Sequence, residues 1–173
     1  LLDSLGRCLL TNVVEHMRSQ GQVAIDILVR NLFERTADIG FLALDSELRA
    51  FAEASPEQRD AQQGALRERF LAYQRKYSVY SDIILLAPSG ELLAQLDQGA
   101  ARDGARDPLL HKCLANTGPY VEQYAHSALV RGDDKALLYG CRVMSLDGLR
   151  VVGVLALCFR FADEAARIFA ALS

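Results

Sequence analysis

The chain has 173 residues, of which 51% are hydrophobic and 24% charged, a composition typical of one globular domain with or without an appended helix. Nineteen Lys and Arg against 22 Asp and Glu give a net charge of −3, so no nucleic-acid partner is expected. The sequence contains no apolar run long enough to cross a membrane and no signal peptide, and because it opens on Leu1 we expect a segment of a longer protein.

Residues 2–44 predict one long helix, because apolar residues recur at helical intervals and no proline occurs before Pro56. An unbroken helix of this length would measure roughly 65 Å, whereas a compact chain of this size has a radius of gyration of only about 16 Å. We therefore expect either a break near Gly21 or an N-terminal part that packs on something outside the fold, most simply a second copy of the chain.

A second helix has clear start signals. Ser55 is its expected N-cap, Pro56 occupies the first helical position, and Gln58 completes a capping box. Its buried stripe is expected to consist of Leu66, Phe70, Tyr73 and Tyr77.

After Tyr77 the periodicity changes from helices to strands. A hairpin is predicted at residues 82–87 and 91–97, followed by a loop at 98–106 and a short helix that begins at Asp107 and Pro108. Further strands are expected at 120–127, 135–144 and 149–161, with turns at 132–134 and 146–148 and a final helix at 162–173. This order predicts an α+β fold, a single antiparallel five-stranded sheet with the helices gathered on one face.

Three passages of the chain carry a family resemblance. They are Arg35-Thr36-Ala37-Asp38-Ile39 with the following residues 41–51, the hairpin entry at residues 77–91, and Gly118-Pro119-Tyr120-Val121 together with residues 147–157. Combined with the order of elements, they resemble the Cache family, the extended PAS-like sensor modules of bacterial chemoreceptors, histidine kinases and cyclic-dinucleotide enzymes. The chain lacks the Trp-containing signature of the amino-acid-binding branch, and Cys158 stands where many relatives have an acidic residue.

The resemblance implies a division into two parts. The first is the long N-terminal helix, residues 1–44, which would pair with a second copy. The second is a PAS-like Cache sensor domain, residues 45–173, whose terminal helix at 162–173 would pass the signal to a downstream signalling domain in the same chain. Relatives usually lie outside the cytoplasmic membrane, while unpaired thiols and the charged segment 1–20 also suit a soluble cytoplasmic receptor.

The alternation of the last strand predicts where a ligand lies. Its larger side chains are expected to pack on the long helix, while Val152, Val154, Ala156 and Cys158 line the other face and leave room for a small molecule. Arg142 is the first candidate, since a guanidinium on a sheet face can clamp a carboxylate. The other candidates are Tyr120, Glu122, Tyr124, Tyr139, Tyr80, Asp82 and His111.

Each of these candidates has a plainer interpretation. Arg142 could pair with Glu122 or point to solvent, Asp82 could serve backbone amides at the start of its strand, and His111 could be exposed beside Lys112.

Catalytic motifs are absent from the sequence, as are metal-ligand and cofactor motifs. The cysteines Cys8, Cys113, Cys141 and Cys158 have apolar neighbours and no CxxC spacing, which favours buried free thiols. The leading hypothesis is a non-enzymatic sensor of the chemotaxis-receptor type that binds a small molecule, with a carboxylate as one candidate. The alternatives are a dimerisation or scaffold module without a ligand, and a redox or haem sensor that uses Cys113, Cys141, Cys158 or His111.

Overall fold

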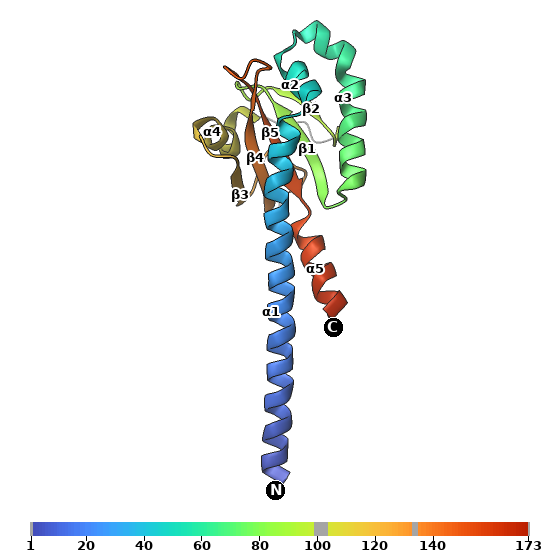
Figure 1. Cartoon of the computed structure of the whole chain (residues 1–173), viewed down its shortest axis with the longest axis vertical. Helices are drawn as coiled ribbons and strands as arrows, with labels where there is room; N and C mark the ends of the chain where they lie inside the picture. The colour runs from blue at the N-terminus through green and yellow to red at the C-terminus, as the bar shows by residue number, and fades with distance from the viewer. Residues whose placement is uncertain (1, 99–103, 133–134, 173) are drawn as a thin grey trace. The chain divides into compact units, whose positions relative to one another are not determined.

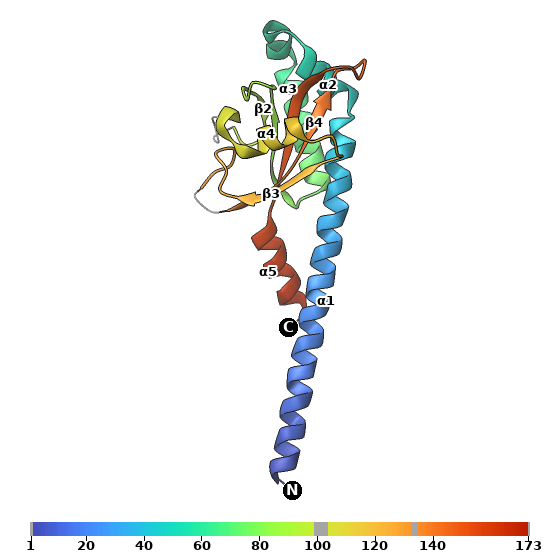
Figure 2. The ribbon, with the colours of Figure 1, turned by 90° about the vertical axis from the view of Figure 1, so that its left-hand side faces the viewer.

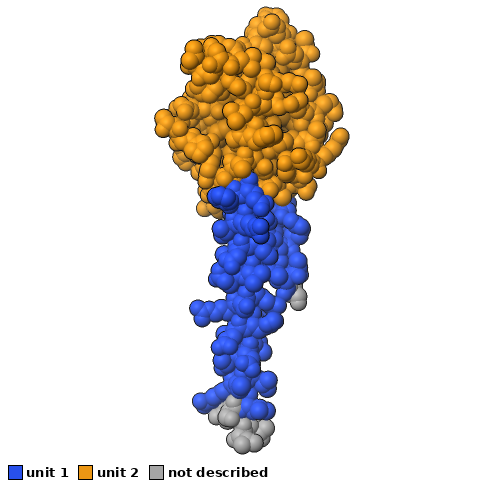
Figure 3. Space-filling view, in the orientation of Figure 1, with its two compact units in different colours: residues 1–34, 162–173 blue, residues 35–161 orange. Residues whose placement is uncertain are grey.

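The computed structural model describes residues 2–98, 104–132 and 135–172. The chain divides into two compact units, one made of residues 1–34 and 162–173 and the other of Arg35–Phe161 (Figure 3). This division differs from the expected one at residue 44, because the boundary follows Glu34 and the C-terminal helix groups with the N-terminal segment. The predicted turn residues 133–134 and loop residues 99–103 lie outside the described residues.

The first helix, α1 (Leu2–Ala43), continues without a break through Gly21, so of the two alternatives only the unbroken helix is found. The part of α1 up to Glu34 forms one unit with α5 (Phe161–Leu172) from Ala162 onward, where the Gln20 side-chain amide donates to the Leu172 carbonyl oxygen at 2.8 Å. Among the residues that the structure describes, no helix combines the length and the apolar composition needed to span a bilayer.

Two helices follow α1 within the larger unit, α2 (Ser46–Glu53) and α3 (Pro56–Lys76). The predicted capping box of α3 is present: Gln58 N–H donates to the Ser55 hydroxyl, and Ser55 N–H donates to the Gln58 side chain. Leu66 and Phe70 are buried as expected.

The larger unit contains a single antiparallel five-stranded sheet in the order β2-β1-β5-β4-β3, which confirms the expected fold class (Figure 1). The strands are β1 (Tyr80–Leu86), β2 (Leu92–Gln95), β3 (Val121–Ala125), β4 (Ala136–Met144) and β5 (Val151–Phe159), with α4 (Pro108–Ala115) between β2 and β3. β3 is shorter than predicted and pairs only as far as Gly140, so residues 141–144 of β4 have no strand on that side. Pro119, which lacks an N–H group, precedes the start of β3.

Helices cover both faces of this sheet, which corrects the expectation that they gather on one. The C-terminal end of α1 with α2 and α3 covers the face of Cys141 and Tyr80: Cys141 Sγ contacts the Ile39 carbonyl oxygen at 3.7 Å, and the Tyr73 and Tyr80 rings stack at 6.1 Å. We call this the α1–α3 face. Helix α4 covers the opposite one, the α4 face (Figure 2). All β5 residues after Val151 are buried, so an uncovered face would have exposed apolar surface to water.

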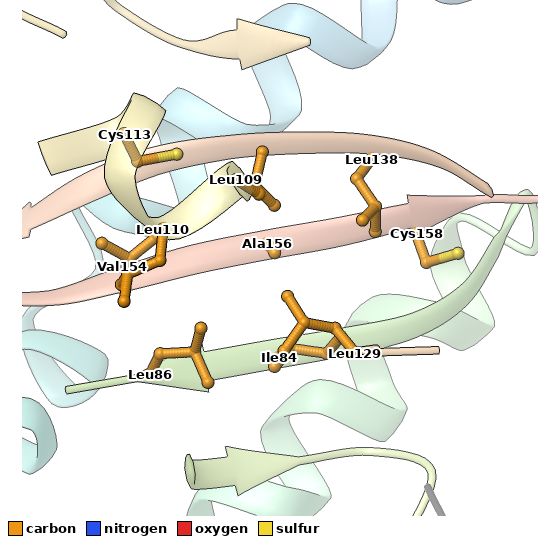
Figure 4. Close-up of a cluster of buried hydrophobic side chains, with 10 residues drawn as sticks. All are labelled: Ile84, Leu86, Leu109, Leu110, Cys113, Leu129, Leu138, Val154, Ala156 and Cys158. Carbon is orange, nitrogen blue, oxygen red and sulfur yellow. The ribbon is translucent and has the colours of Figure 1, made fainter. Parts of the chain in front are cut away.

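The α4 face is filled by the chain's own side chains, so the expectation of open space beside Val154, Ala156 and Cys158 is wrong. These small residues provide the room that α4 needs, since Leu109, Leu110 and Cys113 pack onto them (Figure 4). Leu129, from the segment between β3 and β4, completes the cluster and is fully buried.

Close packing of α4 generates a stability prediction at Gly140. A Cβ atom there would lie 2.6 Å from Cys113 Sγ and 3.2 Å from Leu109 Cδ1, so Gly140→Ala should lower the free energy of unfolding by about 1–3 kcal/mol. Gly64→Ala is the matched control, because its Cβ in α3 meets nothing within 4 Å and should raise stability by about 0.5–1 kcal/mol. Urea unfolding measures both; equal stability of the two variants would show that α4 does not pack as described.

Candidate functional site

The structure separates the eight candidate ligand residues instead of bringing them together. Register places Glu122 opposite Tyr139 and Tyr80 opposite Phe159, which belong to the α1–α3 face. Arg142 pairs with Val154 and Asp82 with Cys158, on the α4 face. Alternation along β4 places Tyr139 and Arg142 on opposite faces of the sheet.

On the α1–α3 face, the candidate Tyr80 makes contacts within the fold. Tyr80 is fully buried, and its hydroxyl donates to Asp38 Oδ2 at 2.7 Å, while Arg35 pairs with the same carboxylate at 3.1 Å. Burial raises the pKa of Tyr80, and the Asp38 carboxylate raises it further, so this phenol stays protonated. Tyr80 therefore anchors the end of α1 to the sheet.

The other aromatic candidates lie towards the β3 edge. Tyr139 is fully buried, and its ring meets that of Tyr120 at 6.2 Å between centroids. Glu122 and Tyr124 are exposed. His111 is exposed on α4, as its plainer interpretation held, with Nε2 3.1 Å from the Ala105 carbonyl oxygen.

Asp82 is buried in a network of N–H donors, in agreement with its plainer interpretation. Its carboxylate accepts from the backbone N–H groups of Ile83 at 2.8 Å and Asp97 at 3.0 Å, and from Gln95 Nε2 at 2.6 Å. Burial raises the pKa of Asp82, and these donors offset only part of that effect. Since the folded chain then binds the proton more tightly than the unfolded chain, the ionised carboxylate lowers stability at neutral pH. This cost is relieved as the pH falls through the raised pKa.

A pocket of about 400 Å³ lies where β4 extends beyond the end of β3. The end of α1, helix α2, the segment before β3, strand β4 and the β4–β5 turn all contribute to it. Its lining residues are Gly40, Ala43, Leu44, Arg49, Gly118, Pro119, Cys141, Arg142, Met144 and Gly148. Two guanidinium groups and no carboxylate stand among these ten residues, so the lining itself offers charge to an anion and none to a cation.

Arg49 is held in place by main-chain carbonyl groups. Its Nε donates to the Met144 oxygen at 2.9 Å, and its terminal nitrogen contacts the Ser145 oxygen.

Glu53, one turn further along α2, accepts from Leu146 N–H at 3.1 Å and pairs with Arg150 at 2.6 Å. Helix α2 is thereby fixed to the β4–β5 turn, and the pocket has a rigid wall.

The start of α2 is held by a charged N-cap. Asp45 accepts from the N–H groups of Glu47 and Leu48, each at 3.0 Å, and pairs with Arg69 of α3. Burial disfavours the Asp45 carboxylate, but the Arg69 hydrogen bond and the Leu48 N–H outweigh it, so the pKa of Asp45 lies below its ordinary value. The cap therefore stays charged at neutral pH.

Arg142, a partly buried residue, contrasts with Arg49, because its guanidinium has no hydrogen-bond or ion-pair partner within the described ranges 2–98, 104–132 and 135–172. It does not pair with Glu122, which stands on the other face of the sheet. A guanidinium without a partner, beside apolar walls, can bind a carboxylate through two parallel N–H···O bonds.

Sequence reasoning found Arg142 but missed Arg49 and the glycine-rich rim of the pocket. Arg49 lies on a short helix whose docking depends on contacts with Met144 and Ser145, far away in the sequence. Gly148 was expected only as a turn residue, and it does adopt the left-handed conformation, with φ of 76°.

The possible metal ligands and the cysteines of the described residues lie apart from the pocket, with the exception of Cys141. No group of three or more His, Cys, Asp and Glu residues in the described part of the chain could hold a metal ion. Burial raises the pKa of Cys113 and of Cys141 to about 12, which keeps both thiols unreactive at neutral pH. Cys158 is also a buried free thiol, whereas Cys8 is exposed, contrary to expectation.

Comparison with known proteins supports the fold through structure rather than sequence. No family profile and no curated protein sequence matches the chain. The sensor domain of the V. cholerae histidine kinase DctB superposes with a TM-score of 0.70 at 16% identity, over 92% of this chain and 60% of that one. The extracellular domain of vpHK1S-Z8, named as a histidine kinase, gives 0.57 at 14% identity, over 91% and 59%.

A Vibrio parahaemolyticus domain, from a protein named as sensory box/GGDEF, gives a TM-score of 0.51 at 14% identity, over 86% of this chain and 59% of that one. The chain thus spans about 60% of the length of these structures. It has their α+β, extended PAS-like sensor fold, as the sequence resemblance implied.

Proposed function

We propose that this chain is a non-enzymatic, ligand-binding sensor domain of a bacterial signal-transduction protein of the chemotaxis-receptor type, and that a small carboxylate binds at Arg142. The observation that carries the proposal is Arg142, a partly buried residue whose guanidinium has no partner among the described residues and which lines a pocket of about 400 Å³ with no carboxylate in its lining. A pocket of this volume suits a small metabolite.

The position of the pocket supports a signalling role. Gly40, Ala43 and Leu44 form one wall, so a bound ligand would contact the end of the helix that begins the chain. At the other end of the domain, β5 stops at Phe159 and α5 begins at Phe161. A ligand that favours one position of these elements by about 1–3 kcal/mol would bias a downstream signalling domain.

Replacement of Arg142 tests the ligand site. In calorimetric titrations with a panel of small mono- and dicarboxylates, we expect at least one to bind, and Arg142→Ala to weaken it about 10- to 100-fold through loss of a charge-assisted pair. Arg142→Lys should retain part of the affinity, because it keeps the charge but loses the two-pronged geometry.

Arg75→Ala is the matched control, since this exposed arginine of α3 lies outside the pocket lining and should leave the affinity unchanged. Equal binding by wild type and Arg142→Ala, or no heat from any carboxylate, would refute the proposed site.

A dimerisation or scaffold role without a ligand is the second candidate, favoured by two observations. The α4 face is already packed. In addition, α1 presents large apolar side chains to solvent before residue 35: Leu5, Leu9, Leu10, Val13, Val14, Met17, Val23, Ile25, Ile27, Val29 and Phe33. A second copy of the chain is the occupant we propose for this helix surface, because identical helices can bury the row of Leu5, Leu9, Val13 and Met17, spaced four residues apart, on both partners. Such pairing is also compatible with the sensor role.

Pairing through α1 predicts a change of mass. Wild type should run as a dimer in light scattering, and Leu9→Glu with Val13→Glu should give a monomer, because buried unpaired carboxylates oppose the contact. Asn12→Glu, at an exposed polar position on the same helix, should remain dimeric. A wild-type monomer at every concentration would contradict the pairing.

A further inference from the structure

The segment of residues 127–131, between β3 and β4, is attached to the domain by side chains. Its residue Leu129 is fully buried in the α4-face cluster beside Ile84 (Figure 4). Strand β3 ends at Ala125 and β4 begins at Ala136, and no strand pairing holds residues 126–132, the described stretch after β3. We call this segment the Leu129 segment.

Two side chains, those of Ser127 and Gln95, form hydrogen bonds to the backbone of Leu129, and we call these bonds the first and the second anchor. The Leu129 N–H donates to the Ser127 hydroxyl at 3.2 Å, and that hydroxyl in turn donates to Asp107 Oδ2 at 2.6 Å. Its carbonyl oxygen accepts from Gln95 Nε2 at 3.1 Å. The first anchor leads to the N-cap of α4 and the second to the sheet.

The second anchor depends on the charge of Asp82. Gln95 Nε2 donates to Asp82 Oδ2 at 2.6 Å and to the Leu129 oxygen, which uses both of its N–H groups. The other Asp82 oxygen accepts from the backbone N–H groups of Ile83 and Asp97. The ionised Asp82 carboxylate can accept hydrogen bonds from all three N–H groups. Once Oδ2 carries a proton, it donates a hydrogen bond, so the group that faces it must be an acceptor and not the Gln95 N–H.

A proton on Oδ2 can be satisfied if the Gln95 amide turns and presents its oxygen. The turned amide directs an oxygen, not an N–H group, at the Leu129 carbonyl, which then has no donor. We propose that Asp82 is an acid-sensitive latch: as a carboxylate it holds the Leu129 segment through Gln95, and on taking up a proton it releases that segment from the α4 face.

Other ionisable groups surround this latch. Asp97 disfavours the Asp82 charge and is itself paired with Arg131 of the Leu129 segment at 2.8 Å. Cys158 lies opposite Asp82 on β5. Asp107 and Lys112 belong to α4 and its N-cap. His126 is exposed and immediately precedes the Leu129 segment. Burial and the Asp97 charge both raise the pKa of Asp82, which moves the transition towards neutral pH.

The latch is tested by amide hydrogen exchange on the full chain, with rates divided by intrinsic rates at each pH. In wild type, protection at Leu129 should fall about three- to tenfold as the pH is lowered from 7.5 to about 4, the effect of one lost hydrogen bond. Protection at the β5 core residues Leu155 and Leu157 should not change, which separates local release from global unfolding.

Two variants and one control decide the outcome. Asp82→Asn and Gln95→Ala should each show low protection at Leu129 that no longer depends on pH. Asp60→Asn, an exposed carboxylate on α3, should behave as wild type. Wild-type protection that does not change with pH, or a pH response that survives in Gln95→Ala, would overturn the latch even if Asp82→Asn fails to fold.

Discussion

Strands β4 and β5 are largely buried on both of their faces. Every β5 residue after Val151 is buried, and β4 lies between β5 and the short edge strand β3. Such a pair is stable only if helices cover both sides, because each exposed face would leave several apolar side chains in water. Helices therefore occupy both the α4 face and the α1–α3 face. The pocket of about 400 Å³ accordingly lies at the edge of the sheet, where the pairing of β3 stops and β4 continues.

Polar groups inside the domain also need partners, because burial removes them from water. Asp82 is buried among apolar side chains of the α4 face and is tolerated because three N–H groups surround it. Arg49 is satisfied by main-chain oxygens at the end of β4. Arg142 differs, since no described residue neutralises it. A partly buried charge without a partner is costly, and an anionic ligand removes that cost.

Local signals in the sequence predicted most of the elements but not their packing. The capping box at Ser55, the Asp107 cap and the apolar strands fix where elements begin, because those interactions involve neighbours in sequence. The packing of α4 on its face of the sheet includes the close contact of Cys113 with Gly140. The spacing of apolar residues in the sequence does not reveal such a contact between distant segments. Arg142 was found because a charge within an apolar strand stands out. Arg49 was missed, since its partners Met144 and Ser145 are set only by the tertiary fold.

Nuclear magnetic resonance distinguishes an anion bound in the edge pocket from one bound beneath α4. During titration with a carboxylate, we expect chemical-shift changes at the Arg142 side chain and at the Gly118 and Gly148 amides, with little change at Ile84 or Leu110. Changes centred on Ile84, Leu110 and Ala156, with none at Arg142, would contradict binding in the edge pocket.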